Sequence, residues 1–276
     1  MTILLSYIKF LLNSTNEHGV HSPFVFDLVM KCIYDKTNYP EYEVLKNYRK
    51  SLLENKNTIE VTDFGAGSRV FKSNTREIAK IAKTAGITSK NVELLFRIVH
   101  YFQPKTILEI GTSLGLATSA LSSGNQNAEI TSLEGCPNTM AIAKEMFQVS
   151  SFKFNAENIK FVNTKFEDYL NNCQLKTENC QLIYFDGNHS KKATLAYFEA
   201  LLPTISNDSI WIFDDIHWSL DMEEAWESIK IHPEVSVTID TFQWGIVFFR
   251  KEQNKEHFII YPNRTWSSYL FEKFRF

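Results

Sequence analysis

The chain has 276 residues, with 29 Lys and Arg against 32 Asp and Glu, so its formal net charge is −3. Hydrophobic residues make up 44% and charged residues 22%, which provides enough apolar material for a core and excludes an intrinsically disordered chain. A protein that binds polyanions generally needs a basic surface to displace counterions. The slight acidic excess therefore predicts no nucleic acid partner.

The cysteines show no CxxC or other metal-ligand spacing, and a chain of this size needs no disulfides, so we expect reduced thiols. The apolar run from Met1 to Leu12 is interrupted by Lys9 and is too short to span a bilayer. These features predict a cytoplasmic protein without integral membrane association. The cysteines are Cys32, Cys136, Cys173 and Cys180.

Residues 1–89 are predicted to form an N-terminal helical extension. Pro23 and Pro40 are each placed to open a helix, while Asn74 and Ser89 are predicted to cap two further helices. Apolar residues recur at helical spacing in both of the last two segments. The expected helices cover residues 3–12, 23–34, 41–54, 74–86 and 89–102.

Residues 90–276 are predicted to form the main domain, in which strands alternate with helices from residue 106 onward. Because the strands are apolar throughout, we expect a parallel sheet covered on both faces. Runs 235–242 and 244–250 are so close in sequence that they must pair antiparallel. The expected fold is α/β, a doubly wound Rossmann-like sheet of seven strands that ends in an antiparallel hairpin. The other strands are 106–110, 128–133, 159–163, 181–186 and 209–214.

A glycine loop, residues 111–115, follows the first of these strands and leads directly into a helix. Gly111 permits a tight turn and Gly115 permits close packing of the helix, whose N-terminus offers free N–H donors. The spacing is GxxxG rather than the GxGxxG of dinucleotide sites, which disfavours a nucleotide-dependent oxidoreductase. Glu134 ends the next strand, where a carboxylate can accept both hydroxyls of a ribose.

Residues 90–250 resemble a class I S-adenosylmethionine-dependent methyltransferase, and most of all the small-molecule O-methyltransferases related to catechol O-methyltransferase. The matching segments are LEIGTSLG, ITSLEG, TKFEDYL, IYFDGNH and IFDDIHW. The resemblance implies S-adenosylmethionine as cofactor. Glu134 would hold its ribose, Lys165 and Phe166 would lie by its adenine, and Asp186 would also contact the cofactor. The methionine part would be held by Glu109, Gly111, Thr112, Ser113 and Gly115.

Acidic residues end two later strands: Asp186 in one, and Asp214 with Asp215 in the other. The resembled family holds a metal ion with an Asp after the fourth strand and an Asp-Asn pair after the fifth. Here the second residue of the pair is Asp, so metal dependence stays open. Three carboxylates suit Mg²⁺, and histidine ligands would favour a transition metal.

Two other interpretations of these residues remain open. Asp186 and Asp215 would orient His189 or His217 as a general base that removes a proton from the acceptor. Alternatively, the acidic residues only form caps and turns. Trp218 is the tryptophan best placed to wall a substrate pocket, and core packing is expected for the others.

The segment Asp63 to Gly67 also resembles a glycine loop, but no strand ending in an acid follows it, so we expect a glycine turn of the N-terminal region that packs near the active site. The sequence thus predicts a methyltransferase acting on a hydroxyl or carboxyl group of a small molecule. N-methylation and a non-catalytic adenosylmethionine-binding module are the alternatives, and a homodimer is one possible assembly.

Overall fold

The structure is a computed structural model that describes residues 3–62, 64, 73–84, 86–171 and 180–262. The chain divides into two compact units. The central unit is residues 37–188, and the terminal unit combines residues 1–36 with residues 189–276. The expected boundary at residue 89 falls inside the central unit, and the extension predicted for residues 1–89 stays a prediction.

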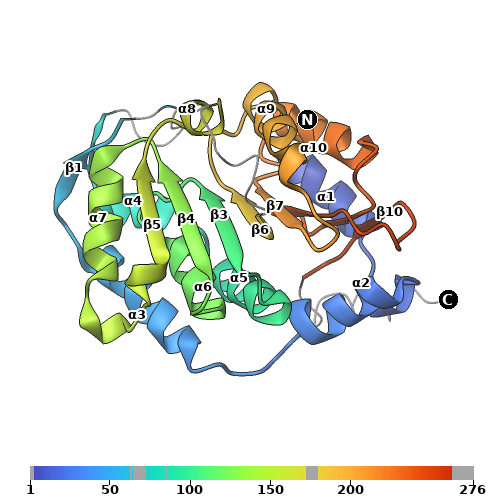
Figure 1. Cartoon of the computed structure of the whole chain (residues 1–276), viewed down its shortest axis with the longest axis horizontal. Coiled ribbons are helices and arrows are strands. Elements are labelled where there is room, and N and C mark those ends of the chain that lie inside the picture. Colours follow the sequence, from blue (N-terminus) through green and yellow to red (C-terminus); the bar gives the residue numbers. More distant parts are fainter. Residues whose placement is uncertain (1–2, 63, 65–72, 85, 172–179, 263–276) are drawn as a thin grey trace. The chain divides into compact units, whose positions relative to one another are not determined.

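The central unit contains four parallel strands in the order β6-β3-β4-β5. Figure 1 shows β3, β4 and β5 side by side, with α7 next to β5. All four residues of β6 and four of the five residues of β3 are buried, as expected for strands covered on both faces. The strands are β3 (Thr106–Ile110), β4 (Glu129–Glu134), β5 (Ile159–Asn163) and β6 (Leu182–Phe185).

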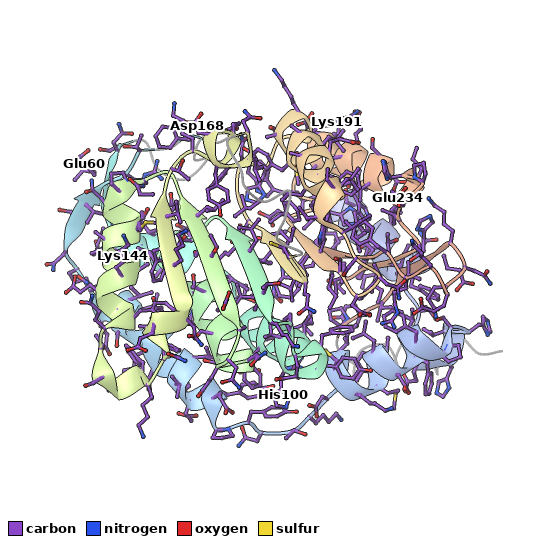
Figure 2. The ribbon with its side chains drawn as sticks, viewed as in Figure 1. Glu60, His100, Lys144, Asp168, Lys191 and Glu234 are labelled. Atoms are coloured by element: carbon purple, nitrogen blue, oxygen red, sulfur yellow. The ribbon has the colours of Figure 1, made fainter. Side chains whose placement is uncertain are left out.

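The helices of the central unit pack through apolar stripes. In α5 (Ser89–Phe102) the stripe Val92, Leu95, Phe96 and Val99 is buried, and this helix packs along α6 (Leu116–Gly124). Side chains fill the space between these elements, and Lys144 of α7 lies at the periphery (Figure 2). The remaining helices are α3 (Glu41–Glu54), α4 (Ile78–Thr84), α7 (Pro137–Phe147) and α8 (Phe166–Asn171), with 3₁₀ turns η3 (Ser150–Phe152) and η4 (Ala156–Asn158).

The two predicted helix caps in this unit were wrong. Residues after Asn74 form β2 (Thr75–Glu77), which pairs antiparallel with β1 (Thr58–Glu60), so α4 begins only at Ile78. Cross-strand hydrogen bonds outweigh the helical pattern of this short segment. The cap of α5 is Thr88, whose side chain accepts a hydrogen bond from the N–H of Asn91 at 3.3 Å.

The terminal unit contains four strands in the order β10-β8-β9-β7. Strand β9 is antiparallel to both β7 and β8, which confirms the predicted hairpin, and β10 is parallel to β8. Strand β10 was not predicted, so the seven predicted strands become eight among the described residues, apart from the short pair β1 and β2. The strands are β7 (Ile210–Asp214), β8 (Val237–Asp240), β9 (Trp244–Phe248) and β10 (Glu256–Ile259).

The terminal unit joins both ends of the described chain, since Thr15 forms a parallel bridge with Ile260. Pro23 opens α2 as predicted, and the Ser22 side chain caps it. Nothing among the described helices is both long and apolar enough for a membrane crossing. The helices are α1 (Ile3–Asn13), α2 (Pro23–Leu28), the π-helix η2 (Val29–Ile33), α9 (Lys191–Leu201) and α10 (Leu220–Ile231), with 3₁₀ turns η1 (Glu17–Gly19) and η6 (Leu202–Thr204).

Large aromatic side chains form much of the core of the terminal unit. Trp211, Trp226 and Trp244 are fully buried, as predicted. Cys32 in this unit, and Cys136 and Cys180 in the central unit, are buried. Three features discussed from the sequence lie outside the described residues: Cys173, Trp266 and, apart from Phe64, the segment 63–67.

Candidate cofactor and acceptor sites

The glycine loop of the central unit requires its glycines. Gly111 has φ +108°, and a Cβ built on it would lie 2.1 Å from the carbonyl oxygen of Asp186. Gly115 has φ +77° at the N-cap of α6. Both conformations disfavour any residue with a side chain. The loop can therefore run closely against the end of β6.

Glu134, at the end of β4, holds this loop through its carboxylate. Oε2 accepts a hydrogen bond from the N–H of Ser113 at 2.7 Å, and Oε1 accepts one from the N–H of Cys136 at 2.8 Å. Burial raises the pKa of Glu134, although these N–H groups partly oppose the shift. A carboxylate has about four lone-pair positions, so both oxygens retain capacity for a ribose hydroxyl.

Glu109 lies at the centre of a fully buried hydroxyl network. Its Oε2 accepts hydrogen bonds from Thr118 at 2.6 Å and from Ser132 at 2.5 Å. Ser132 also contacts the Thr112 hydroxyl at 2.5 Å, which extends the network into the glycine loop. Oε1 has no hydrogen-bond partner among the described residues. Burial raises the pKa of Glu109 to about 8.

An open pocket borders the glycine loop. One wall consists of residues 111–114 and Asp186, and the other comes from α4 and the segment after it. The sequence did not predict this second wall. Gly86 packs closely on α6 there, since a Cβ on it would lie 2.6 Å from Leu116. The pocket is lined by Ile81, Ala82, Gly86, Ile87, Gly111, Thr112, Ser113, Leu114, Leu116, Ala117 and Asp186.

Lys165 and Phe166 lie where β5 leads into α8. The Phe166 ring packs against Gly187, the residue after Asp186. The Lys165 ammonium lies 5.3 Å from the centre of the Phe64 ring, and that ring packs against Gly135, next to Glu134. Sequence analysis did not identify Phe64, whose side chain is 48% exposed. Aromatic and cationic groups thus lie on both sides of Glu134 and Asp186.

In the terminal unit, the two acidic residues after β7 share a partner. The Gln243 side-chain amide donates to Asp214 at 3.2 Å and also to Asp215, and the indole N–H of Trp244 donates to Asp214 at 2.7 Å. Gln243 carries no sequence signal of this role. Asp215 adopts a left-handed conformation with φ 56°.

His189 lies close to this acidic pair. Its Nε2 is 4.0 Å from Oδ2 of Asp215, and its ring centre is 6.0 Å from that of Trp218. The side chain is 24% exposed. A partly exposed imidazole beside a carboxylate and an indole can exchange a proton with a bound molecule.

His217 lies between two carboxylates and does not suit the predicted role of general base. Its Nε2 is 2.8 Å from Asp240 and its Nδ1 is 3.2 Å from Glu223. Burial lowers its pKa, but hydrogen bonding and attraction from Asp240 and Glu223 outweigh burial, so the pKa is raised. Ionised carboxylates only accept hydrogen bonds, so the two contacts favour a ring that is protonated on both nitrogens. His217, which also stacks on Phe242, therefore acts as a structural clamp.

The residues predicted as metal ligands are divided between the two units. Asp186 belongs to the central unit, whereas Asp214 and Asp215 belong to the terminal unit. Over the part of the chain that the structure describes, no three or more His, Cys, Asp or Glu side chains are grouped so as to hold a metal ion. Asp214 and Asp215 are instead engaged by Gln243 and Trp244. The predicted metal site is not confirmed.

Comparison with known proteins gives a family match for part of the chain. Residues 108–216 match the family model of a methyltransferase domain. No curated protein matches the chain by sequence.

Solved structures share the fold at low identity. A methyltransferase from Podospora anserina, PaMTH1, solved with SAH, is 16% identical with a TM-score of 0.56, over 84% of this chain and 97% of that chain. An O-methyltransferase from Bacillus cereus in complex with SAH is 18% identical with a TM-score of 0.52, over 78% and 93%. The O-methyltransferase TomG from Streptomyces achromogenes, involved in tomaymycin synthesis and solved with SAM, is 13% identical with a TM-score of 0.50, over 59% and 81%.

The family match and the geometry coincide in one stretch of sequence. It begins in β3, contains the glycine loop and Glu134, and ends just after Asp214 and Asp215. The predicted resemblance to methyltransferases is therefore confirmed: residues 108–216 match the model of a methyltransferase domain.

Proposed function

We propose that this protein is an S-adenosylmethionine-dependent methyltransferase that methylates an oxygen atom of a small molecule. The observation that carries the proposal is the glycine loop, closed by the 2.7 Å hydrogen bond from Ser113 to Glu134 and bordered by an open pocket. The solved structures with SAH or SAM bound, two of them named O-methyltransferases, support the same cofactor and acceptor atom.

The central unit supplies the groups for the cofactor. Glu134 accepts the ribose hydroxyls through the lone pairs that Ser113 and Cys136 leave open. The methionine part lies in the pocket against the loop and Asp186, where the N-terminus of α6 favours its carboxylate. Lys165, Phe166 and Phe64 lie on the adenine side. Glu109 is fully buried and supports the loop through Ser132 and Thr112.

Methyl transfer is a direct displacement. The acceptor oxygen forms a bond to the methyl carbon as the carbon–sulfur bond breaks, and the sulfonium becomes the neutral thioether of SAH. Most of the acceleration comes from holding the two reactants in line. The proton of a hydroxyl acceptor passes to His189, and Asp215 at 4.0 Å stabilises the imidazolium that forms. A carboxylate acceptor needs no such transfer.

His189 suits the role of base better than His217 does. Both nitrogens of His217 face carboxylates, whereas the side chain of His189 is 24% exposed. No step is assigned to a metal ion, because the predicted ligands are divided between the two units and the metal site stays a prediction.

The proposal is tested by calorimetric titration with S-adenosylmethionine and by measuring SAH formation with phenols, catechols, carboxylic acids and amines. We expect micromolar cofactor binding and turnover of at least one oxygen acceptor, which His189→Asn slows without weakening cofactor binding. Absence of cofactor binding would contradict the proposed function. Turnover of amines alone would replace O-methylation with N-methylation.

A further inference from the structure

Two consecutive residues of α3, Tyr48 and Arg49, hold opposite walls of the cofactor pocket. The Tyr48 hydroxyl donates to the carbonyl oxygen of Leu114, in the glycine loop, at 2.8 Å. The Arg49 guanidinium donates to the carbonyl of Ile87 at 2.5 Å and to that of Ala82 at 3.4 Å. Leu114, Ile87 and Ala82 all line the pocket, so one turn of α3 connects its two sides.

Tyr48 is rigidly held. Its side chain is completely buried, and its ring packs against those of Phe147, Phe152 and Phe154 at centroid distances of 5.7, 5.3 and 5.7 Å. Burial, together with the charge of Glu109, raises its pKa well above the ordinary value, so the hydroxyl keeps its proton and donates. A Cβ on Gly115 would lie 2.6 Å from this hydroxyl oxygen. The loop is therefore in close contact with Tyr48 along its back.

Arg49 reaches the other wall with two donors of a single planar group. Its guanidinium remains charged although burial lowers its pKa. The carbonyls of Ala82 and Ile87 flank Gly86, and Gly86 packs closely on Leu116 of α6. Because the fork spans both carbonyls, Arg49 fixes the carbonyl of Ala82 in α4 relative to that of Ile87, which precedes α5.

We propose that Tyr48 and Arg49 are positioning residues that set the spacing between the two walls of the cofactor pocket. Neither residue lines that pocket. The inference rests on the proposed function only in naming S-adenosylmethionine as the occupant. It assigns part of cofactor affinity to α3, which lies outside the matched residues 108–216.

The variants Tyr48→Phe and Arg49→Met remove these hydrogen bonds with little change in volume. Leaving a buried carbonyl without its donor weakens cofactor binding by about tenfold in each variant. The turnover number at saturating cofactor should change less than about twofold, because the reacting groups are untouched. Arg49→Lys keeps one donor and should recover part of the affinity.

Tyr34→Phe is the matched control. Tyr34 is also a buried tyrosine that donates to a backbone carbonyl, that of Tyr261, at 3.0 Å. Both residues belong to the terminal unit and neither lines the pocket. We expect this variant to lower the melting temperature about as much as Tyr48→Phe does, and to leave the dissociation constant of S-adenosylmethionine unchanged.

Hydrogen exchange of the cofactor-free protein gives a readout that does not depend on the proposed function. Tyr48→Phe should speed exchange in residues 112–117, and Arg49→Met in residues 82–88, whereas Tyr34→Phe changes neither. If the variants show this faster exchange but the wild-type protein binds no cofactor, the positioning role is supported and the proposed function is contradicted. Unchanged exchange and affinity in folded Tyr48→Phe and Arg49→Met would overturn the inference, as would a fall in turnover without a change in affinity.

Discussion

The N–H of Ser113 donates a 2.7 Å hydrogen bond to Oε2 of Glu134. This contact links the loop after β3 to the end of the neighbouring strand β4. The other oxygen of the same carboxylate accepts from Cys136, so one side chain sets the conformation of two strand ends. Glu134 is therefore needed for the shape of the site in addition to any contact with a ribose.

Replacing Glu134 with Gln should weaken binding of S-adenosylmethionine about tenfold or more. The amide has a single oxygen, so one of the two N–H donors is left facing an NH₂ group. Calorimetric titration measures the effect. Glu129→Gln, at an exposed position of the same strand, should bind the cofactor as the wild type does. Equal affinity for both variants would contradict the role of Glu134.

Gly111→Ala should lower both stability and cofactor affinity. The new Cβ would lie 2.1 Å from the carbonyl oxygen of Asp186, and the residue would have to keep φ +108°. Relief requires a shift of the loop away from β6, at a cost of about 1–3 kcal/mol. Thermal unfolding with and without cofactor measures both effects. A variant with the wild-type melting temperature would show that the loop tolerates a side chain.

Glu109→Gln should gain stability relative to the wild type as the pH rises from 5 to 8. The pKa of Glu109 is about 8 in the folded protein, against an ordinary value of 4.5. Over that interval the folded state holds a proton that the unfolded state has released, so wild-type stability falls as pH rises. The difference should change by about a few kcal/mol.

Urea unfolding of both proteins at several pH values measures this change, with Glu129→Gln as the control. A difference between Glu109→Gln and wild type that stays constant from pH 5 to 8 would show that Glu109 is ionised throughout. The hydroxyl donors of Ser132 and Thr118 would then stabilise the charge fully.

His217→Gln should destabilise the protein most below pH 6.5 and less as the pH rises. The pKa of His217 is raised in the folded state, so its stabilising effect is complete below the ordinary value of 6.5 and is lost as the pH passes through the raised value. Below pH 6.5 the loss should be about 1–3 kcal/mol. The exposed His18, whose side chain is 79% accessible, provides the control His18→Gln. A loss of stability in His217→Gln that grows as the pH rises would contradict the stabilising role of His217.

His189→Asn should lower the turnover number about 10²-fold or more with a hydroxyl acceptor, because the proton then has no positioned base. The dissociation constant of the cofactor should not change. An acceptor carboxylate, already ionised at neutral pH, should react almost normally. Equal losses with both kinds of acceptor would assign His189 to positioning rather than to proton transfer.

Local sequence patterns predicted the parts of the fold that depend on nearest neighbours. Strand β3, the turn at Gly111 and the helix after it are encoded within fifteen residues, 106–120, and they form as expected. Strand β2 was missed because its pairing with β1 competes with a helical pattern of similar strength. Strand β10 is short and half-exposed, and β8, its partner, lies about twenty residues away in sequence.

The candidate site also combines residues that local sequence indicates with residues that depend on distant partners. Glu134 could be proposed as a ribose ligand from the sequence, because an acidic residue at the end of a strand that follows a glycine loop has few other roles. The catalytic role of His217 stays a prediction, and its contacts with Glu223 and Asp240 could not be foreseen because these partners come from α10 and β8. Gln243 and Phe64 carry no local signal, and only their contacts with Asp215 and Gly135 reveal them.

The bridge between Thr15 and Ile260 places the two ends of the described chain in one unit. During synthesis, residues 37–188 emerge from the ribosome as one continuous segment. This segment already contains the whole glycine loop and all four parallel strands around it. The terminal unit cannot close until β10 has emerged. The central unit can therefore fold while α1 and α2 still lack the strands of the terminal unit, which are synthesised later.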